Sequence, residues 1–184
     1  MEKVSMFKKL ALTSAVLMTL ASPAAMASEA KQEIVDVDFS FEGPFGTYDK
    51  AALQRGLMVY RQVCSACHSM KRVAYRNLTA LGYTEDQVKA IAAEYTVMDG
   101  PNDDGEMFER AARPSDRFKG PFENDKAAMA ANGGALPPDL SLITKARHGG
   151  GEYVFSVLTG YGAAPKHVTV PEGKYYNMAM AGNV

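Results

Sequence analysis

Two cysteines and a histidine lie close together in the stretch Cys64-Ser65-Ala66-Cys67-His68. The pattern Cys-x-x-Cys-His is typical of covalent attachment of a c-type haem. Two cysteines one helical turn apart reach the two vinyl groups on one edge of a porphyrin, and the next residue then lies under the iron. We therefore predict that Cys64 and Cys67 hold one haem c covalently and that His68 is the proximal ligand of its iron.

Other interpretations use the same thiols. A structural zinc site needs four Cys or His ligands, whereas the chain has 2 cysteines and 3 histidines, and His148 and His167 lie far along the sequence. A thioredoxin-like disulfide oxidoreductase places its cysteine pair at the start of a helix after a strand, whereas a helical pattern arrives at Cys64. A chance match or a structural disulfide also stays open, because the motif is short. Haem attachment fits the residues best.

The first residues have the pattern of a secretory signal peptide. A basic start is followed by an apolar run over residues 10–20 and by the small-residue cleavage site Ala25-Met26-Ala27. The apolar run is too short to span a membrane, and it is apolar on all sides, unlike an ordinary amphipathic helix. We expect residues 1–27 to be removed on export to the periplasm.

The remaining residues, 28–184, have the length of one domain with its own core. The net charge of the whole chain is -1, which gives no reason to expect a nucleic-acid partner. No later run approaches the roughly 20 consecutive apolar residues of a transmembrane helix. As written, the sequence predicts a periplasmic haem domain.

Apolar spacing and capping patterns predict a mainly helical protein with long loops. Thr84 and Gln87 form a capping box, and Asn124 is a candidate helix cap. Gly56, inside a predicted helix, marks either a close backbone contact or a tolerated surface position. The predicted elements are an extended arm over 28–48, a helix from Asp49 to Cys64, a helix after Thr84 to about Thr96, irregular structure to Phe122, short helices over Asp125–Ala131 and Leu140–Arg147, a helix or strand over Glu152–Thr159, and a loop from Val168.

Three further features are candidates for a haem pocket. A ligating histidine usually donates its outer ring N–H to a carbonyl, and the pair Pro137-Pro138 offers carbonyls on a rigid backbone. A rigid entry into a helix is an equally good explanation of the two prolines. Arg147 is a candidate partner for a haem propionate, with Tyr153 adding a hydroxyl, although ordinary surface positions remain the alternative for both.

Longer motifs occur in one order along the chain. They are VCSACHSM at 63–70, VAYR at 73–76, DGPN at 99–102, DGEMF at 104–108, GALPPDLS at 134–141, ARHGG at 146–150, YVF at 153–155 and LTGY at 158–161. Through them the chain, from about Arg55 to Asn177, resembles the cytochrome c1 family, the haem subunits of quinol:cytochrome c oxidoreductases (bc1 complexes).

The resemblance implies a class I cytochrome c-like haem domain enlarged by long loop insertions. It implies an electron carrier without a catalytic site of its own, which assembles with cytochrome b, accepts electrons from the Rieske iron-sulfur protein and passes them to a cytochrome c. It assigns Pro138, Arg147 and Tyr153 to the haem pocket. An acidic surface attracts basic cytochrome c in this family, and the candidates here are Asp99, Asp103, Asp104, Glu106 and Glu109.

The resemblance also implies features that lie beyond the last residue. The family's sixth iron ligand, a methionine, is expected about three residues after Val184, and a C-terminal membrane anchor is expected later still, so the chain resembles a truncated family member. Met178 and Met180 replace family residues that are not ligands. The remaining alternative is a generic periplasmic c-type haem protein that acts as a ligand-binding sensor or a peroxidase.

Overall fold

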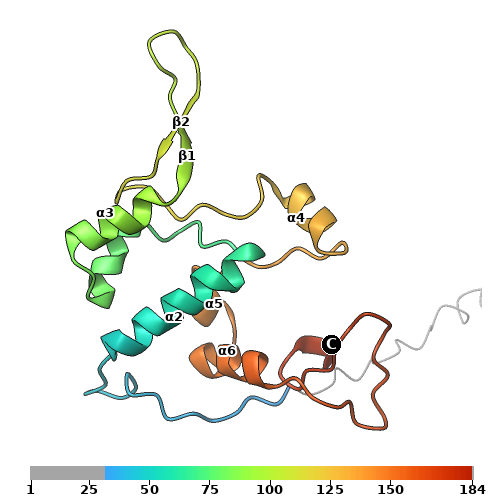
Figure 1. Ribbon diagram of the computed structural model, residues 1–184. Coiled ribbons are helices and arrows are strands. Elements are labelled where there is room, and N and C mark those ends of the chain that lie inside the picture. The colour runs from blue at the N-terminus through green and yellow to red at the C-terminus, as the bar shows by residue number, and fades with distance from the viewer. Residues whose placement is uncertain (1–31, 184) are drawn as a thin grey trace, which may run out of the picture. The chain divides into compact units, whose positions relative to one another are not determined.

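The computed structural model describes residues 32–183. The predicted signal peptide, residues 1–27, therefore lies outside the described residues. Within the described range, helices are joined by long segments without regular structure and by one two-stranded sheet (Figure 1). The prediction of a mainly helical protein thus holds only in part. No helix in this range combines the length and the apolar composition that crossing a bilayer requires.

The arm over residues 32–48 contains no helix or strand, as predicted for this part of it. Its backbone is tied to the C-terminal part of the chain. The N–H of Glu33 donates to the carbonyl oxygen of Met178 at 2.9 Å, and the N–H of Val35 donates to the buried hydroxyl of Ser156 at 2.8 Å. The arm is therefore anchored by partners that are distant in sequence.

Helix α2 (Lys50–Gln62) delivers the chain to the Cys-x-x-Cys-His motif, as predicted. Asp49 caps it, because one carboxylate oxygen accepts two N–H groups of the first turn at 2.8 and 3.3 Å. Leu57 and Tyr60 are its buried side chains. A Cβ at Gly56 would meet no described atom within 4 Å, so this glycine is a tolerated surface position.

The 3-10 helix η2 (Tyr75–Leu81) packs against α2, and α3 (Glu85–Ala93) packs against η2. The predicted capping box is present. The N–H of Thr84 donates to the Gln87 side chain at 2.8 Å, and the N–H of Gln87 donates to the Thr84 hydroxyl at 3.2 Å. The buried core residues are Leu57, Tyr60, Tyr75, Leu78, Val88, Ile91, Ala92, Ala112 and Phe118.

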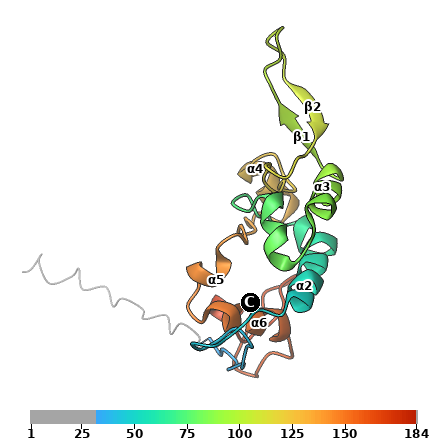
Figure 2. The same cartoon turned by 90° about the vertical axis from the view of Figure 1, so that its left-hand side faces the viewer.

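A β-hairpin follows α3, where the sequence predicted the end of a helix and then irregular structure. Strand β1 (Thr96–Asp99) pairs antiparallel with β2 (Phe108–Ala111), with Thr96 opposite Ala111. The side chain of Asn102 closes the loop by accepting two backbone N–H groups at 3.0 and 2.9 Å. The prediction was wrong here because apolar periodicity cannot identify strands as short as these. Both views show the hairpin projecting away from the helices (Figures 1 and 2).

Arg110, on β2, holds the base of the hairpin. Its guanidinium pairs with Asp99 on β1 and forms a bidentate pair with Asp116 at 2.6 and 3.1 Å. Asp116 also accepts the N–H of Arg113 at 2.7 Å. The bond from Arg110, followed by that from Arg113, lowers the pKa of Asp116 to about 2. The hairpin is therefore fixed at its base by an ionised network.

The C-terminal half contributes two more helices that the sequence indicated. Asn124 caps α4 (Asp125–Ala131) by accepting a backbone N–H at 3.0 Å, as predicted. The segment for which helix and strand both remained open is helix α6 (Gly150–Thr159). The final stretch is loop-like apart from the short 3-10 helix η3 (Ala181–Asn183).

Helix α5 (Ile143–Ala146) is shorter than the predicted helix over Leu140–Arg147. The carboxylate of Asp139 accepts the N–H of Ser141 at 2.9 Å, which forms a side-chain turn at the point where the helix was expected to begin. Such turns compete with helical hydrogen bonding. The residues directly after Asp139 therefore form this turn, and the helix begins later, at Ile143.

We expect Asp116→Asn to flatten the acid dependence of stability. Because the folded-state pKa of Asp116 is about 2, against an ordinary value of 3.8, its stabilising contribution is complete above about pH 4 and is lost as the pH falls through about 2. The variant lacks this contribution at neutral pH, so its free energy of unfolding lies below that of the wild type there and converges with it in acid. Urea unfolding followed by circular dichroism across this range measures the difference.

The matched control is Asp103→Asn, at an exposed position of the hairpin loop. Its stability is expected to follow the wild-type curve. A difference between Asp116→Asn and wild type that stayed constant from neutral to strongly acidic pH would contradict the ion-pair account.

Candidate haem site

The two thiols lie on a 3-10 turn directly after α2. Helix η1 covers Cys64–Ala66, and the carbonyl oxygen of Cys64 accepts the N–H of Cys67 at 3.1 Å and that of His68 at 2.8 Å. The hydroxyl of Ser65 donates to the last turn of α2 at 2.8 Å. Both cysteines are free thiols, with Cys64 half-buried and Cys67 exposed. One short turn thus presents two thiols and an imidazole.

The imidazole of His68 is oriented by a hydrogen bond through Nδ1. This atom lies 2.8 Å from the carbonyl oxygen of Pro138. A carbonyl oxygen can only accept, so Nδ1 carries a proton, and in the neutral ring Nε2 is then the nitrogen with the lone pair. A neutral ring nitrogen with a free lone pair is the atom that ligates haem iron. Of the two predicted prolines, the structure brings Pro138 to the histidine.

Tyr60 adds a contact that the sequence did not reveal, because this residue counted only as an apolar position of a helix. Its hydroxyl donates to the carbonyl oxygen of His68 at 3.2 Å. Burial, followed by the charge of Asp139, raises the pKa of Tyr60 to about 12, so the hydroxyl stays protonated at neutral pH. Its ring packs edge-on against buried Phe118, with centroids 6.0 Å apart. The backbone of His68 is thereby tied to the core.

Asp139 is a second residue that the sequence analysis missed. One carboxylate oxygen accepts the hydroxyl of Ser69 and the N–H of Lys71, both at 2.8 Å, and the other accepts the N–H of Ser141 at 2.9 Å. Burial alone would raise the pKa of Asp139, but hydrogen bonds from Ser141, Lys71 and Ser69 lower it to about 2. The local signal was an aspartate before a serine in a turn. Its distant partners leave no trace in the sequence.

The other two predicted pocket residues lie around the junction of α5 and α6. Arg147 directly follows α5 and is exposed, and Tyr153 is half-buried on α6. Among the described residues, neither side chain has a hydrogen-bond or ion-pair partner, and no hydrogen bond joins either one to His68. The structure therefore does not link them directly to the histidine as it does Pro138.

Large apolar side chains are exposed on the same segments that carry the site. Val63, beside Cys64, is 67% exposed, Leu136 on the proline segment is 48% exposed, and Leu158 on α6 is 66% exposed. A bound apolar group would find such side chains to pack against on these segments. A porphyrin is a large apolar disc, so the thiols, the free Nε2 and the apolar surface together fit a haem.

The zinc interpretation fails within the described residues. There, no group of three or more His, Cys, Asp or Glu side chains could hold a metal ion. The two cysteines also form no disulfide with each other. What the motif offers is therefore one imidazole ligand beside two free thiols.

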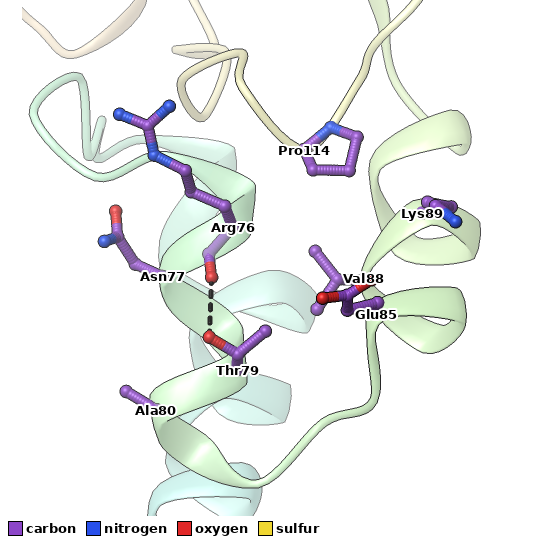
Figure 3. A pocket seen from close by; sticks show the side chains of 8 residues that line it. All are labelled: Arg76, Asn77, Thr79, Ala80, Glu85, Val88, Lys89 and Pro114. Carbon is purple, nitrogen blue, oxygen red and sulfur yellow. Dashed lines mark hydrogen bonds between the residues drawn. The ribbon is translucent and has the colours of Figure 1, made fainter.

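A hollow of about 510 Å³ lies away from the motif, between η2 and α3. Figure 3 shows Val88 and Glu85 of α3 on one side of it and Thr79 and Arg76 of η2 on the other. The Thr79 hydroxyl donates a hydrogen bond to the carbonyl oxygen of Arg76 at 2.9 Å. Pro114 completes the upper rim in this view. No cysteine or histidine lines this hollow, so it does not belong to the haem site.

Comparisons with known proteins agree with this site. The model of the Cytochrome C1 family matches residues 39–184. The chain is 50% identical over 163 residues to "Cytochrome c1 1, heme protein, mitochondrial" of Arabidopsis thaliana, a match that covers 88% of this chain and 53% of the relative. It is 53% identical over 153 residues to "Cytochrome c1" of Rhodospirillum rubrum, with 83% and 56% covered. It is 50% identical over 141 residues to "Cytochrome b-c1 complex catalytic subunit, mitochondrial" of Candida albicans, with 76% and 49% covered.

Two thiols and a carbonyl-oriented imidazole on one turn, together with these matches, define the class of cytochrome c-like haem domains. The chain belongs to the cytochrome c1 family. It spans about half the length of the curated relatives it matches. Membership of the cytochrome c1 family favours an electron-transfer haem protein over a sensor, a peroxidase or a disulfide oxidoreductase.

We expect Tyr60→Phe to lower the free energy of unfolding by about 1 kcal/mol. The substitution keeps the buried ring but removes the donor to the carbonyl oxygen of His68. Urea unfolding of the haem-loaded protein measures the change. The control is Tyr175→Phe, because Tyr175 is 77% exposed, and its expected change is within about 0.5 kcal/mol. Equal effects of the two substitutions would show that the Tyr60 hydroxyl does not support the site.

Proposed function

We propose that the chain carries one covalently bound haem c and is the electron-transfer subunit of a bc1 complex. It would accept electrons from the Rieske iron-sulfur protein and pass them to a cytochrome c. The observation that carries this proposal is the pairing of His68 with the carbonyl oxygen of Pro138 at 2.8 Å, directly beside two free thiols.

Cys64 and Cys67 would hold the porphyrin through thioether bonds, and Nε2 of His68 would ligate its iron. The haem, when bound, supplies a one-electron ferrous/ferric couple. The chain's own contribution is to fix the tautomer and direction of the imidazole through Pro138. Arg147, whose guanidinium is exposed and has no described partner, is available to pair with a propionate, and Tyr153 would add a hydroxyl.

The second axial ligand is proposed to be a methionine that follows residue 184, as the family resemblance implies. Of the two methionines near the end of the described chain, Met180 has a contact through its sulfur, which lies 4.0 Å from the hydroxyl of Tyr161. The backbone N–H and carbonyl of Met178 are hydrogen-bonded to Gly160 and Glu33. The sulfur contact supports the assignment of Met180 as a structural residue.

A basic cytochrome c is the proposed electron acceptor, and the hairpin is its proposed docking surface. Asp103, Asp104, Glu106 and Glu109 are exposed on it. Asp99, the fifth candidate, is paired with Arg110 and therefore offers less free charge. Acidic side chains on a projecting loop increase the rate of encounter with a cation, in a manner that salt weakens.

The remaining assignments rest on the N-terminal sequence pattern for the signal peptide and on the family resemblance for the anchor and partners. The proposed arrangement is a signal peptide over residues 1–27, a haem domain over 28–184, and a later C-terminal anchor that holds this domain on the periplasmic side of the inner membrane beside cytochrome b. One relative is named as a subunit of a cytochrome b-c1 complex. The subunit would have no catalytic site of its own, because electron transfer needs only the haem and its partners.

The test is electron transfer in the assembled complex containing the full-length protein. With wild-type protein, added quinol is expected to reduce a c-type haem, and an oxidised cytochrome c is expected to reoxidise it. Cys67→Ala leaves one thiol for attachment, so we expect most covalent haem and most quinol:cytochrome c activity to be lost. Stopped-flow absorbance follows both steps.

The control is Lys89→Ala, at an exposed position on α3 far along the chain from the motif, which is expected to keep both steps. A wild-type complex whose c-type haem stayed oxidised after quinol addition would contradict the proposed electron path. Full covalent haem in Cys67→Ala would contradict the proposed attachment.

A further inference from the structure

Two segments lie side by side at the haem site and are joined by a ladder of hydrogen bonds. Besides the bonds to the Asp139 carboxylate, the N–H of Leu140 donates to the carbonyl oxygen of Ser69 at 2.8 Å. The N–H of Arg72 donates to the hydroxyl of Ser141 at 3.0 Å. The rungs therefore begin at the residues that directly follow His68 and Pro138.

The proline segment needs this ladder, because prolines cannot anchor it themselves. Pro137 and Pro138 have no N–H groups to donate, and Pro138 is exposed rather than packed in the core. Asp139 is the first residue after them with a side chain that binds the opposite segment. Its carboxylate reaches both Ser69, next to the iron-ligating residue, and Lys71.

We propose that Asp139 is a positioning residue that holds the carbonyl oxygen of Pro138 against Nδ1 of His68, and thereby keeps the reduction potential of the haem low. The inference rests on the proposed haem ligation. A firm hydrogen bond at Nδ1 makes the imidazole a stronger donor to the metal, which favours the ferric state. A carboxylate that anchors the acceptor thus acts on the iron through Pro138 and His68.

The test compares four variants of the full-length, haem-loaded protein in its complex. Asp139→Asn loses the charge and one acceptor oxygen, Asp139→Glu keeps the charge but displaces both oxygens, and Ser69→Ala removes one rung. Asp116→Asn is the matched control, because Asp116 is an equally well hydrogen-bonded carboxylate with a lowered pKa at the base of the hairpin. Redox titration gives the midpoint potential, and EPR of the oxidised haem reports the orientation of the axial imidazole.

We expect both Asp139 variants to shift the ferric/ferrous equilibrium toward ferrous by up to about tenfold, which corresponds to about 59 mV for one electron, and to change the EPR spectrum. Ser69→Ala is expected to shift it in the same direction by less. Asp116→Asn is expected to leave both readouts at their wild-type values.

Wild-type potentials in all the Asp139 and Ser69 variants would overturn the inference. So would a shift in Asp139→Asn with none in Asp139→Glu, because charge alone would then explain it. If Asp139→Asn fails to assemble, Asp139→Glu and Ser69→Ala decide the matter. Absence of covalent haem from the wild-type protein would refute the proposed function instead, so the two failures are distinguishable.

Discussion

The hydrogen bond from Nδ1 of His68 to the carbonyl oxygen of Pro138 connects parts of the chain that are 70 residues apart. It fixes which ring nitrogen is protonated and therefore which one is free for a metal. The rest of the site is arranged around this bond. Tyr60 ties the His68 backbone to the core, and Asp139 ties the proline segment to the residues after His68. These contacts hold the Pro138 carbonyl beside His68, which the two prolines could not do through N–H donors of their own because they have none.

The distribution of apolar side chains shows why a chain with so much loop can still fold around this site. The buried members of the core cluster lie between Leu57 and Phe118, and after Phe118 the described part of the chain adds to it one partly buried apolar side chain, Leu140. Later segments expose apolar side chains such as Leu142 and Leu158, and the segment before the thiols exposes Val59 and Val63. With the proposed haem bound, this surface would pack on the porphyrin, so the cofactor would complete a core that the polypeptide leaves unfinished.

Local signals in the sequence were sufficient for part of this structure. The caps of α3 and α4 depend on residues three positions apart, so Thr84 and Asn124 could be identified by inspection. The haem-attachment motif could likewise be identified because its cysteines and histidine lie within five consecutive residues. The hairpin and the roles of Tyr60 and Asp139 were not, because they depend on pairings across long separations that neither periodicity nor short motifs encode. Arg147 and Tyr153 rest on the family resemblance rather than on described contacts.

The central claim is that one turn of this chain carries a covalently bound porphyrin. Trypsin cleaves after Arg61 and Lys71, so both cysteines lie in a single peptide, residues 62–71. Mass spectrometry of this peptide from the mature protein, taken from cells that attach c-type haem, is the most direct measurement. The account predicts one peptide that carries the mass of one haem and absorbs visible light. An unmodified peptide with two free thiols, or one with an internal disulfide, would contradict it.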